Sequence, residues 1–122
     1  MRNAVTTDQA PPPGGSYSQG VRWGNLLFTS GQTPRGLDRE VVTGSFRTQA
    51  DQVYANVRAV AEAGGAAMDD ALQVTVYLSD MADAPDADAA FAEAFAPPRP
   101  ARTTVASAIP VAIEIDAIFG IR

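Results

Sequence analysis

The chain has 122 residues, enough for one domain to bury a hydrophobic core, so we expect a single domain over residues 1–122. Its 9 basic and 14 acidic side chains leave a net charge of −5, which argues against a nucleic-acid backbone as the main partner. Cysteine and histidine are both absent, which excludes a disulfide framework, a cysteine nucleophile, thiolate or imidazole metal ligands and the commonest general base.

The N-terminal part of the chain predicts an irregular segment followed by a hairpin. Residues 3–16 are rich in Thr, Pro and Gly and contain three consecutive prolines at 11–13, a composition typical of a loop. From Tyr17 to Ser30, β-favouring side chains are interrupted by Gly24-Asn25. This pattern predicts two short strands joined by a tight turn.

A helix with one apolar stripe is predicted next. Apolar residues recur at alternating spacings of four and three, at Phe46, Ala50, Val53, Val57 and Val60. Ser45 is placed to cap the start of this helix, and Gly64-Gly65 is placed to end it.

A strand and a second helix are predicted after this first helix. Leu72, Val74, Val76 and Leu78 alternate with polar residues, so they share one strand face, which should meet the first helix. Helical spacing returns further along the chain, with Asp83 placed to cap, Pro85 tolerated in the first turn and Pro97-Pro98 ending the element. The apolar positions of this second helix are Ala84, Ala87, Phe91 and Phe95.

Two strand-like runs, 102–107 and 112–118, close the chain. In the later run Ile113, Ile115 and Ala117 alternate with Glu114 and Asp116. The whole pattern predicts an α+β fold with two helices packed on one face of a sheet. The other face of the sheet must then be either exposed to solvent or buried in an oligomer.

Tyr17, Ser30, Arg102 and Glu114 are the candidate functional residues. Each also has a purely structural interpretation, since Tyr17 and Ser30 suit the ends of a hairpin and Arg102 suits a charge that protects an edge strand. Together, a guanidinium fork at Arg102 and a carboxylate at Glu114 suit the hydrolysis of a small anionic substrate. The glycine pairs lack the spacing of a nucleotide-binding motif.

Five segments stand out in order along the chain: residues 17–20 (YSQG), 24–32 (GNLLFTSGQ), 74–81 (VTVYLSDM), 100–102 (PAR) and 113–118 (IEIDAI). Their order and spacing resemble the pattern of the RidA/YjgF (reactive intermediate deaminase) family. No single segment is specific, but the ordered set spans nearly the whole chain. The sequence therefore resembles this family.

The resemblance implies a chorismate-mutase-like α+β fold, assembled as a homotrimer with an inner barrel of sheets and clefts between neighbouring subunits. It also implies an enzyme that converts reactive imine or enamine acids, such as 2-aminoacrylate and 2-iminobutanoate, into 2-keto acids and ammonia. No cofactor and no metal are implied, because the imine is already an activated electrophile.

The resemblance also implies roles for particular residues. Arg102 is expected to hold the substrate carboxylate, while Glu114 and a backbone carbonyl place the attacking water, and Tyr17 and Ser30 line the same cleft. Two further substrate-binding positions depart from the family pattern, since Thr104 replaces a frequent Cys and Asp88 replaces a common Asn. The turn before Glu114 is about two residues shorter than that pattern.

Two other functions stay open. A non-catalytic trimer that binds small keto or amino acids is the alternative motivated by Thr104 and Asp88. Nucleic-acid processing, proposed for some relatives, is disfavoured by the acidic balance and the missing histidine. The sequence has no apolar signal region and no run of about 18 apolar residues, so a cytoplasmic location without membrane contact is the default expectation.

Overall fold

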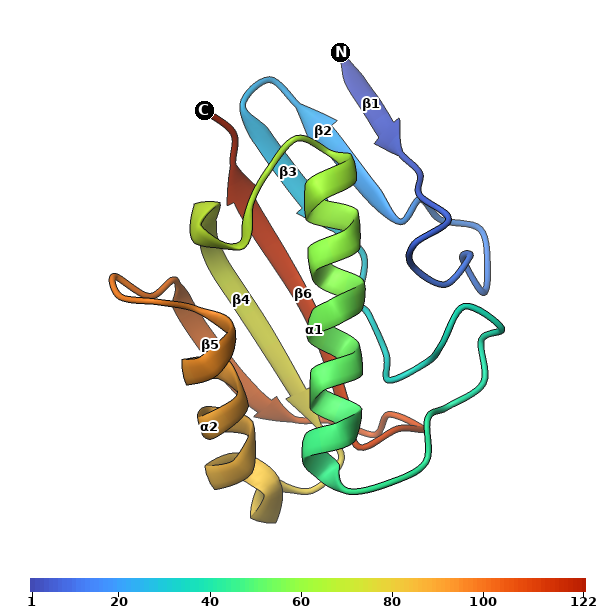
Figure 1. The fold of residues 1–122 in the computed structure, drawn as a ribbon, viewed down its shortest axis with the longest axis vertical. Helices are drawn as coiled ribbons and strands as arrows, with labels where there is room; N and C mark the ends of the chain where they lie inside the picture. Colours follow the sequence, from blue (N-terminus) through green and yellow to red (C-terminus); the bar gives the residue numbers. More distant parts are fainter.

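A six-stranded mixed sheet and two helices make up the fold (Figure 1). The computed structural model describes residues 1–122. The strands are β1 (Arg2–Val5), β2 (Gly20–Trp23), β3 (Leu26–Thr29), β4 (Ala71–Leu78), β5 (Ala101–Ala106) and β6 (Ile113–Gly120), and the helices are α1 (Phe46–Ala63) and α2 (Ala84–Ala94). Short 3-10 turns precede β4 and α2. Neither helix is both long enough and apolar enough to serve as a membrane span.

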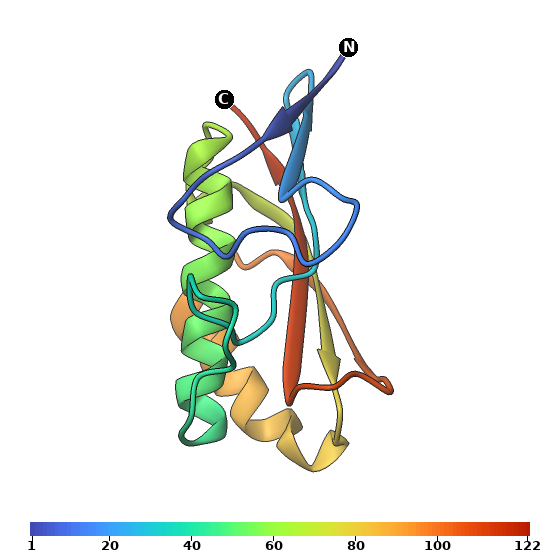
Figure 2. The ribbon, with the colours of Figure 1, turned by 90° about the vertical axis from the view of Figure 1, so that its right-hand side faces the viewer.

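The strand order in the sheet is β1-β2-β3-β6-β4-β5. The β4–β5 pair is parallel, and all other pairs are antiparallel. The C-terminal strand β6 therefore lies in the middle of the sheet, between β3 and β4, while β5 forms an outer edge. Both helices cover the same sheet face (Figure 2), as the sequence pattern predicts.

Helix α1 has the predicted N-cap residue, the predicted apolar stripe and the predicted C-terminal end. The hydroxyl of Ser45 accepts a hydrogen bond from the backbone N–H of Thr48, and Gly64 is the C-cap. Ala50, Val53, Val57 and Val60 are fully buried. The sequence predicts that this helix packs against β4. In the structure it packs mainly against β6, the central strand, and against β3 (Figure 1).

The sheet face without helices carries polar and exposed apolar side chains. Ile113, Ile115 and Ala117 of β6 are buried under the helices, so Glu114 and Asp116 lie on the open face. Register places Thr75 and Tyr77 of β4 beside these two carboxylates. Four large apolar side chains on this face are exposed, namely Trp23, Phe28, Leu72 and Val105.

The structure corrects the predicted position of Leu72. Val74, Val76 and Leu78 are buried as expected, but Leu72 is 52% exposed. A register shift between Ala71 and Gln73 interrupts the alternation, and Leu72 lies against Gly120 on the open face. A bulge adds one residue to the strand, so side chains before it change face.

Two further predictions are corrected by neighbouring elements. Residues 3–5 belong to β1 rather than to a loop, because their backbone pairs with β2 and Val5 is buried beside Gly20. Asp83 sits before α2 but makes no capping hydrogen bond, since it already has helical backbone angles. The side chain of Asp80 instead caps the preceding 3-10 turn, by accepting from the N–H of Ala82.

Candidate active site

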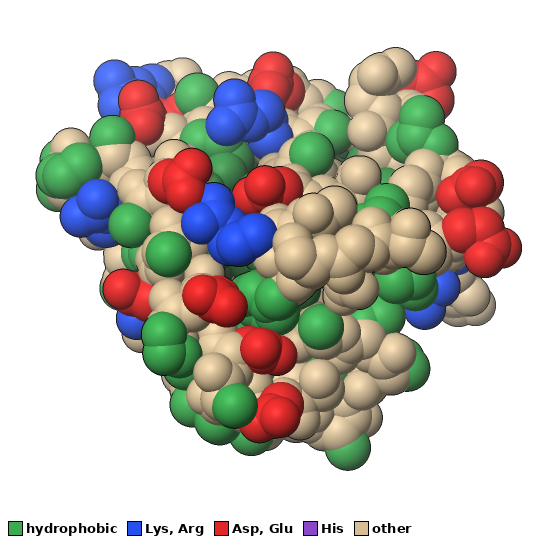
Figure 3. All heavy atoms as spheres, turned by 60° about the horizontal axis from the view of Figure 1, so that its bottom comes forward, with side chains coloured by type: hydrophobic (Ala, Val, Ile, Leu, Met, Phe, Trp, Pro, Cys, Tyr) green, Lys and Arg blue, Asp and Glu red, His purple; other side chains and the backbone are tan.

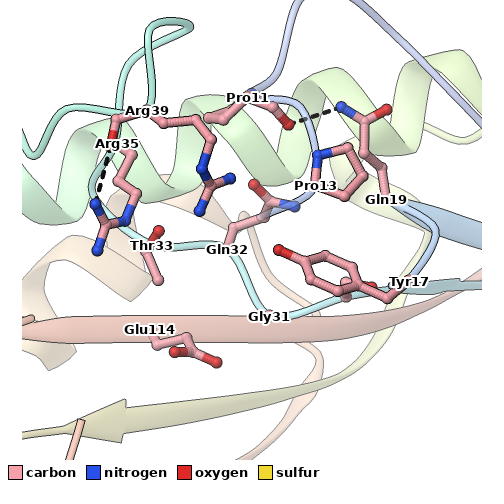
Figure 4. Close-up of a pocket in the computed structure, with 11 residues that line it drawn as sticks. Pro11, Pro13, Tyr17, Gln19, Gly31, Gln32, Thr33, Arg35, Arg39 and Glu114 are labelled. Carbon is pink, nitrogen blue, oxygen red and sulfur yellow. Dashed lines mark hydrogen bonds between the residues drawn. The ribbon is translucent and has the colours of Figure 1, made fainter. Parts of the chain in front are cut away.

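A cavity of about 400 Å³ lies between the segment before β2, the loop after β3 and strand β6 (Figure 4). Its size is in the range of small-molecule sites. The lining residues are Pro11, Pro13, Tyr17, Gln19, Ser30, Gly31, Gln32, Thr33, Arg35, Arg39 and Glu114. The cavity thus brings together three of the predicted site residues: Tyr17, Ser30 and Glu114.

Glu114 reaches the cavity because the chain approaches it closely at Gly31. A Cβ atom on Gly31 would lie 2.2 Å from Oε2 of Glu114, so any side chain at this position would push the carboxylate out of its place. Paired backbone hydrogen bonds hold the loop against β6, with Gln32 N donating to Ile115 O (2.7 Å) and Ile115 N donating to Gln32 O (3.0 Å). The glycine and this bridge together place the carboxylate beneath the loop.

The environment of Glu114 favours its protonated form. Burial raises the pKa of this carboxyl, and the negative charge of Asp116 on the same face raises it further. Asp116 accepts a hydrogen bond of 3.0 Å from the hydroxyl of Tyr77, and this bond is the main reason that the pKa of Tyr77 is raised. A carboxyl whose pKa is raised is better suited than an ordinary one to accept a proton from water and pass it on.

Tyr17 and Ser30 occupy the wall of the cavity next to the first hairpin. The hydroxyl of Tyr17 accepts a hydrogen bond from the N–H of Gly14 (2.9 Å), and the residue is 48% exposed. The hydroxyl of Ser30 donates to the carbonyl of Ser18 at 2.5 Å, while its N–H donates to Gln19 O. Both side chains are thereby oriented by nearby backbone groups.

Gln19 holds the other wall of the cavity and is a residue that sequence reasoning missed. Its side chain is buried, with Nε2 donating to Thr7 O (3.0 Å) and Pro11 O (2.9 Å), and with Oε1 accepting from Thr7 N (2.7 Å). These bonds fasten the proline-rich segment over the cavity. The only signal in the sequence is that Gln19 lies within the segment YSQG.

Arg102 does not line this cavity. It lies on the edge strand β5, opposite Val74 and on the helix-covered side of the sheet. Its Nη1 donates to Oδ1 of Asp88 on α2 (2.7 Å), and its guanidinium lies 4.8 Å from the ring centre of Phe91. Thr104 faces the same side as Arg102, because the two are separated by one residue of the strand.

The six predicted site residues therefore form two groups. Tyr17, Ser30 and Glu114 line the cavity, whereas Arg102, Thr104 and Asp88 lie at the outer edge beside α2. Within one chain, Glu114 and Arg102 point to opposite faces of the sheet. A small molecule cannot contact both side chains of the same subunit.

Two cations in the cavity, Arg35 and Arg39, were also missed by sequence reasoning. They lie in the loop between β3 and α1, where the sequence shows no helical or strand periodicity. The available signal was two arginines three and seven residues after Gln32, which ends the segment 24–32. Because a loop has no regular periodicity, its sequence does not show on which side its residues lie. Only the folded loop shows where these side chains point.

The surface charges do not form an extended basic region on the face drawn in Figure 3, where acidic and basic side chains are interspersed with apolar ones. Such a face lacks the clustered cations that bind a phosphate backbone. No three carboxylates are grouped so that they could hold a metal ion.

The chain is similar to known proteins over nearly its whole length. The family model described as Endoribonuclease L-PSP matches residues 7–120. A RutC family protein of Pyrococcus horikoshii is 42% identical over 122 residues and covers 97% of each chain. A 2-iminobutanoate/2-iminopropanoate deaminase of Dermatophagoides farinae is 38% identical over 125 residues, covering 99% of this chain and 98% of that protein.

The fold is also similar to that of a solved structure. RidA from an Antarctic Psychrobacter superposes with a TM-score of 0.93 at 35% identity, covering 98% of this chain and 99% of the other. The likeness thus extends over the whole sheet and both helices.

Proposed function

This chain belongs to the YjgF/RidA family, and we propose that it hydrolyses reactive 2-imino acids and their enamine tautomers, of the 2-iminobutanoate and 2-aminoacrylate type, to 2-keto acids and ammonia. The observation that carries this proposal is a carboxyl of raised pKa, Glu114, which lies against Gly31 in a cavity of suitable size. The deaminase among the relatives supports the reaction type.

The complete site would be assembled between subunits. A 2-imino acid carries a carboxylate that needs a cation such as Arg102, but Arg102 of the same chain faces away from Glu114. Because β5 is an edge strand, its residues are free to approach a neighbouring molecule. In the proposed homotrimer, Arg102 of one subunit therefore completes the cavity of the next.

The open sheet face gives physical support to the trimer. Trp23 is 59% exposed, and Phe28, Leu72 and Val105 are also exposed on this face. Several large exposed apolar side chains on one sheet face are typical of an interface between proteins. Packing three such faces together would bury these side chains and form the inner barrel that is expected of the family.

The reaction follows from the proposed geometry. Arg102 of the neighbouring subunit holds the substrate carboxylate through its planar fork, which orients the imine carbon toward Glu114. Glu114 accepts a proton from water as the water oxygen bonds to the imine carbon. The nitrogen takes up that proton to give a carbinolamine. A second proton then passes from the carbinolamine hydroxyl, through Glu114, to the nitrogen as the carbon–nitrogen bond breaks, so that ammonia and the 2-keto acid leave. Tyr17, Ser30 and the backbone near Thr104 would line the substrate.

A non-catalytic binding trimer is the second candidate, and the Asp88–Arg102 ion pair favours it. The side chain of Asp88 is two-thirds exposed, and it pairs with the Arg102 guanidinium that the substrate carboxylate would need. The substrate must displace this carboxylate, which weakens binding compared with a neutral residue at position 88. A protein of this kind would bind keto acids saturably without turnover.

A coupled assay distinguishes the two candidates. The imine is generated in situ by an amino-acid oxidase or a dehydratase, and the release of 2-keto acid is compared with the uncatalysed rate. We expect acceleration by the wild-type chain and its loss in Arg102→Ala. Saturable binding of 2-oxobutanoate without acceleration would favour the binding protein, and salt-insensitive absence of RNA retention would exclude nucleic-acid processing.

A further inference from the structure

The cavity contains more positive charge than the proposed reaction requires. Arg35 and Arg39 line it together with Glu114, its only carboxylate. Neither arginine forms an ion pair, since the four ion pairs of the chain involve Arg47, Arg102 and Arg122 as cations. A guanidinium that faces a cavity without a carboxylate partner is available for an anionic ligand.

The hydrogen bonds of the two arginines leave most of their donors free. Nη1 of Arg35 donates to the carbonyl of Arg39 (2.9 Å), and Nη1 of Arg39 donates to the carbonyl of Pro12 (2.5 Å). Each guanidinium has five N–H donors, and these bonds orient it without neutralising its charge. In Figure 4 the two guanidinium groups hang from the loop on the side of the cavity opposite Glu114.

The backbone that carries these arginines is held in place. Residues 33–42 form a small hairpin, with a bridge between Arg35 and Val41 and a bond from Val42 N to Pro34 O. The amide of Asn56, which is 1% exposed on α1, donates to Thr33 O (3.1 Å) and to Arg35 O (2.9 Å). The loop is therefore fastened to a buried helix residue.

Arg39 adopts a left-handed backbone conformation, with φ of 68°. This conformation is unfavourable for a residue with a long side chain, and such conformations gather at functional sites. The turn from Gly36 to Arg39 is closed by a hydrogen bond of 2.9 Å from Arg39 N to Gly36 O. Its effect is to direct the Arg39 side chain back toward the proline-rich wall and the cavity.

We propose that residues 33–42 equip this cavity for substrates with a second anionic group, so that Arg35 and Arg39 hold the side-chain carboxylate of an imino dicarboxylic acid. This assignment rests on the proposed deaminase function, in which Arg102 of a neighbouring subunit holds the first carboxylate. The reaction is unchanged, since water still adds to the imine carbon and ammonia leaves.

Equilibrium binding tests the assignment without requiring turnover. We would compare 2-oxoglutarate with 2-oxopentanoate by calorimetry, because these acids share a five-carbon chain and differ in the terminal carboxylate. The wild-type chain should bind 2-oxoglutarate at least about tenfold more tightly, as expected for charge-assisted hydrogen bonds. Equal affinities would overturn the proposal.

Variants identify the responsible residues. Arg35→Gln and Arg39→Gln each keep a donor for the backbone carbonyl but remove the charge. Each should weaken 2-oxoglutarate binding about tenfold and leave 2-oxopentanoate binding unchanged. Arg22→Gln is the matched control, because Arg22 also bonds only to backbone carbonyls, those of Gly24 and Gly64, and does not line the cavity. Equal weakening of both acids in the Arg35 and Arg39 variants would mean that these residues serve the first carboxylate or the fold, contrary to the proposal.

The kinetic arm separates this proposal from the proposed function. Imines of glutamate and norvaline, each generated by an amino-acid oxidase, should be hydrolysed with kcat/KM at least about tenfold higher for the dicarboxylate. Turnover of neither imine together with selective 2-oxoglutarate binding would refute the deaminase function and keep the anion assignment. Equal turnover of both imines together with equal binding of both acids would support the deaminase function and refute the anion assignment.

Discussion

Mixed trimers provide the sharpest test of where Arg102 acts. Arg102→Ala and Glu114→Gln should each be inactive alone, since each removes one half of every site. In an equal mixture, a site is intact when its Arg102 comes from a Glu114→Gln subunit and its Glu114 comes from an Arg102→Ala subunit. Random assembly meets each condition in about half of the cases, so about one quarter of the wild-type activity should return.

The expected value depends on the geometry of the sheet. Arg102 lies opposite Val74 on the helix-covered face of an edge strand, whereas Glu114 lies opposite Tyr77 on the open face. If both residues acted from one chain, a mixture of the two variants would contain no intact site. The coupled deaminase assay, applied after subunit exchange between differently tagged chains, measures the recovered activity.

A second mixture serves as the control. Wild-type chains mixed equally with the double variant should retain about one quarter of full activity when sites form between chains, and about one half when they form within chains. Affinity purification through both tags shows that mixed trimers are present. No recovery in verified mixtures of the single variants would refute the intersubunit site.

Four further predictions concern the cavity and the outer edge. Gly31→Ala should lower kcat about 10- to 100-fold with little change in fold by circular dichroism, because the added Cβ would displace the Glu114 carboxylate. For wild type, log(kcat/KM) should fall as pH drops through the raised pKa of Glu114, at a higher pH than for an ordinary glutamate, since the ionised form accepts the proton. Raising the pKa means that the fold disfavours the ionised form, so Glu114→Gln should have a higher Tm than wild type at neutral pH, and this difference should shrink at acidic pH. Asp88→Asn should lower KM about two- to fivefold with kcat unchanged, as expected for loss of an exposed competing ion pair. An unchanged KM would show that Asp88 does not compete with substrate.

The regular elements could be predicted from local pattern because their signals are local. The stripe from Phe46 to Val60 and the alternation from Ile113 to Ala117 each follow the period of one element, and the structure confirms both. Local pattern was wrong where a neighbouring element decides the outcome. Residues 3–5 pair only because β2 offers a free edge, and Leu72 changes face at a bulge.

The candidate site divides in the same way. The sequence alone shows which residues can carry the chemistry, and the ordered segments, two of which contain Arg102 and Glu114, identify the family. It also shows that Glu114 lies on the polar face of its strand, because alternation is a property of a single strand.

Only the tertiary structure decides which of these residues can meet. The order β3-β6-β4-β5 arises from pairing between segments far apart in the chain. No local pattern therefore shows that Ser30 and Glu114 share a cavity while Arg102 lies on the edge strand. The same holds for Arg35 and Arg39, whose direction depends on a loop fastened to Asn56. Side-chain chemistry is a local property of sequence, whereas proximity results from the packing of the whole chain.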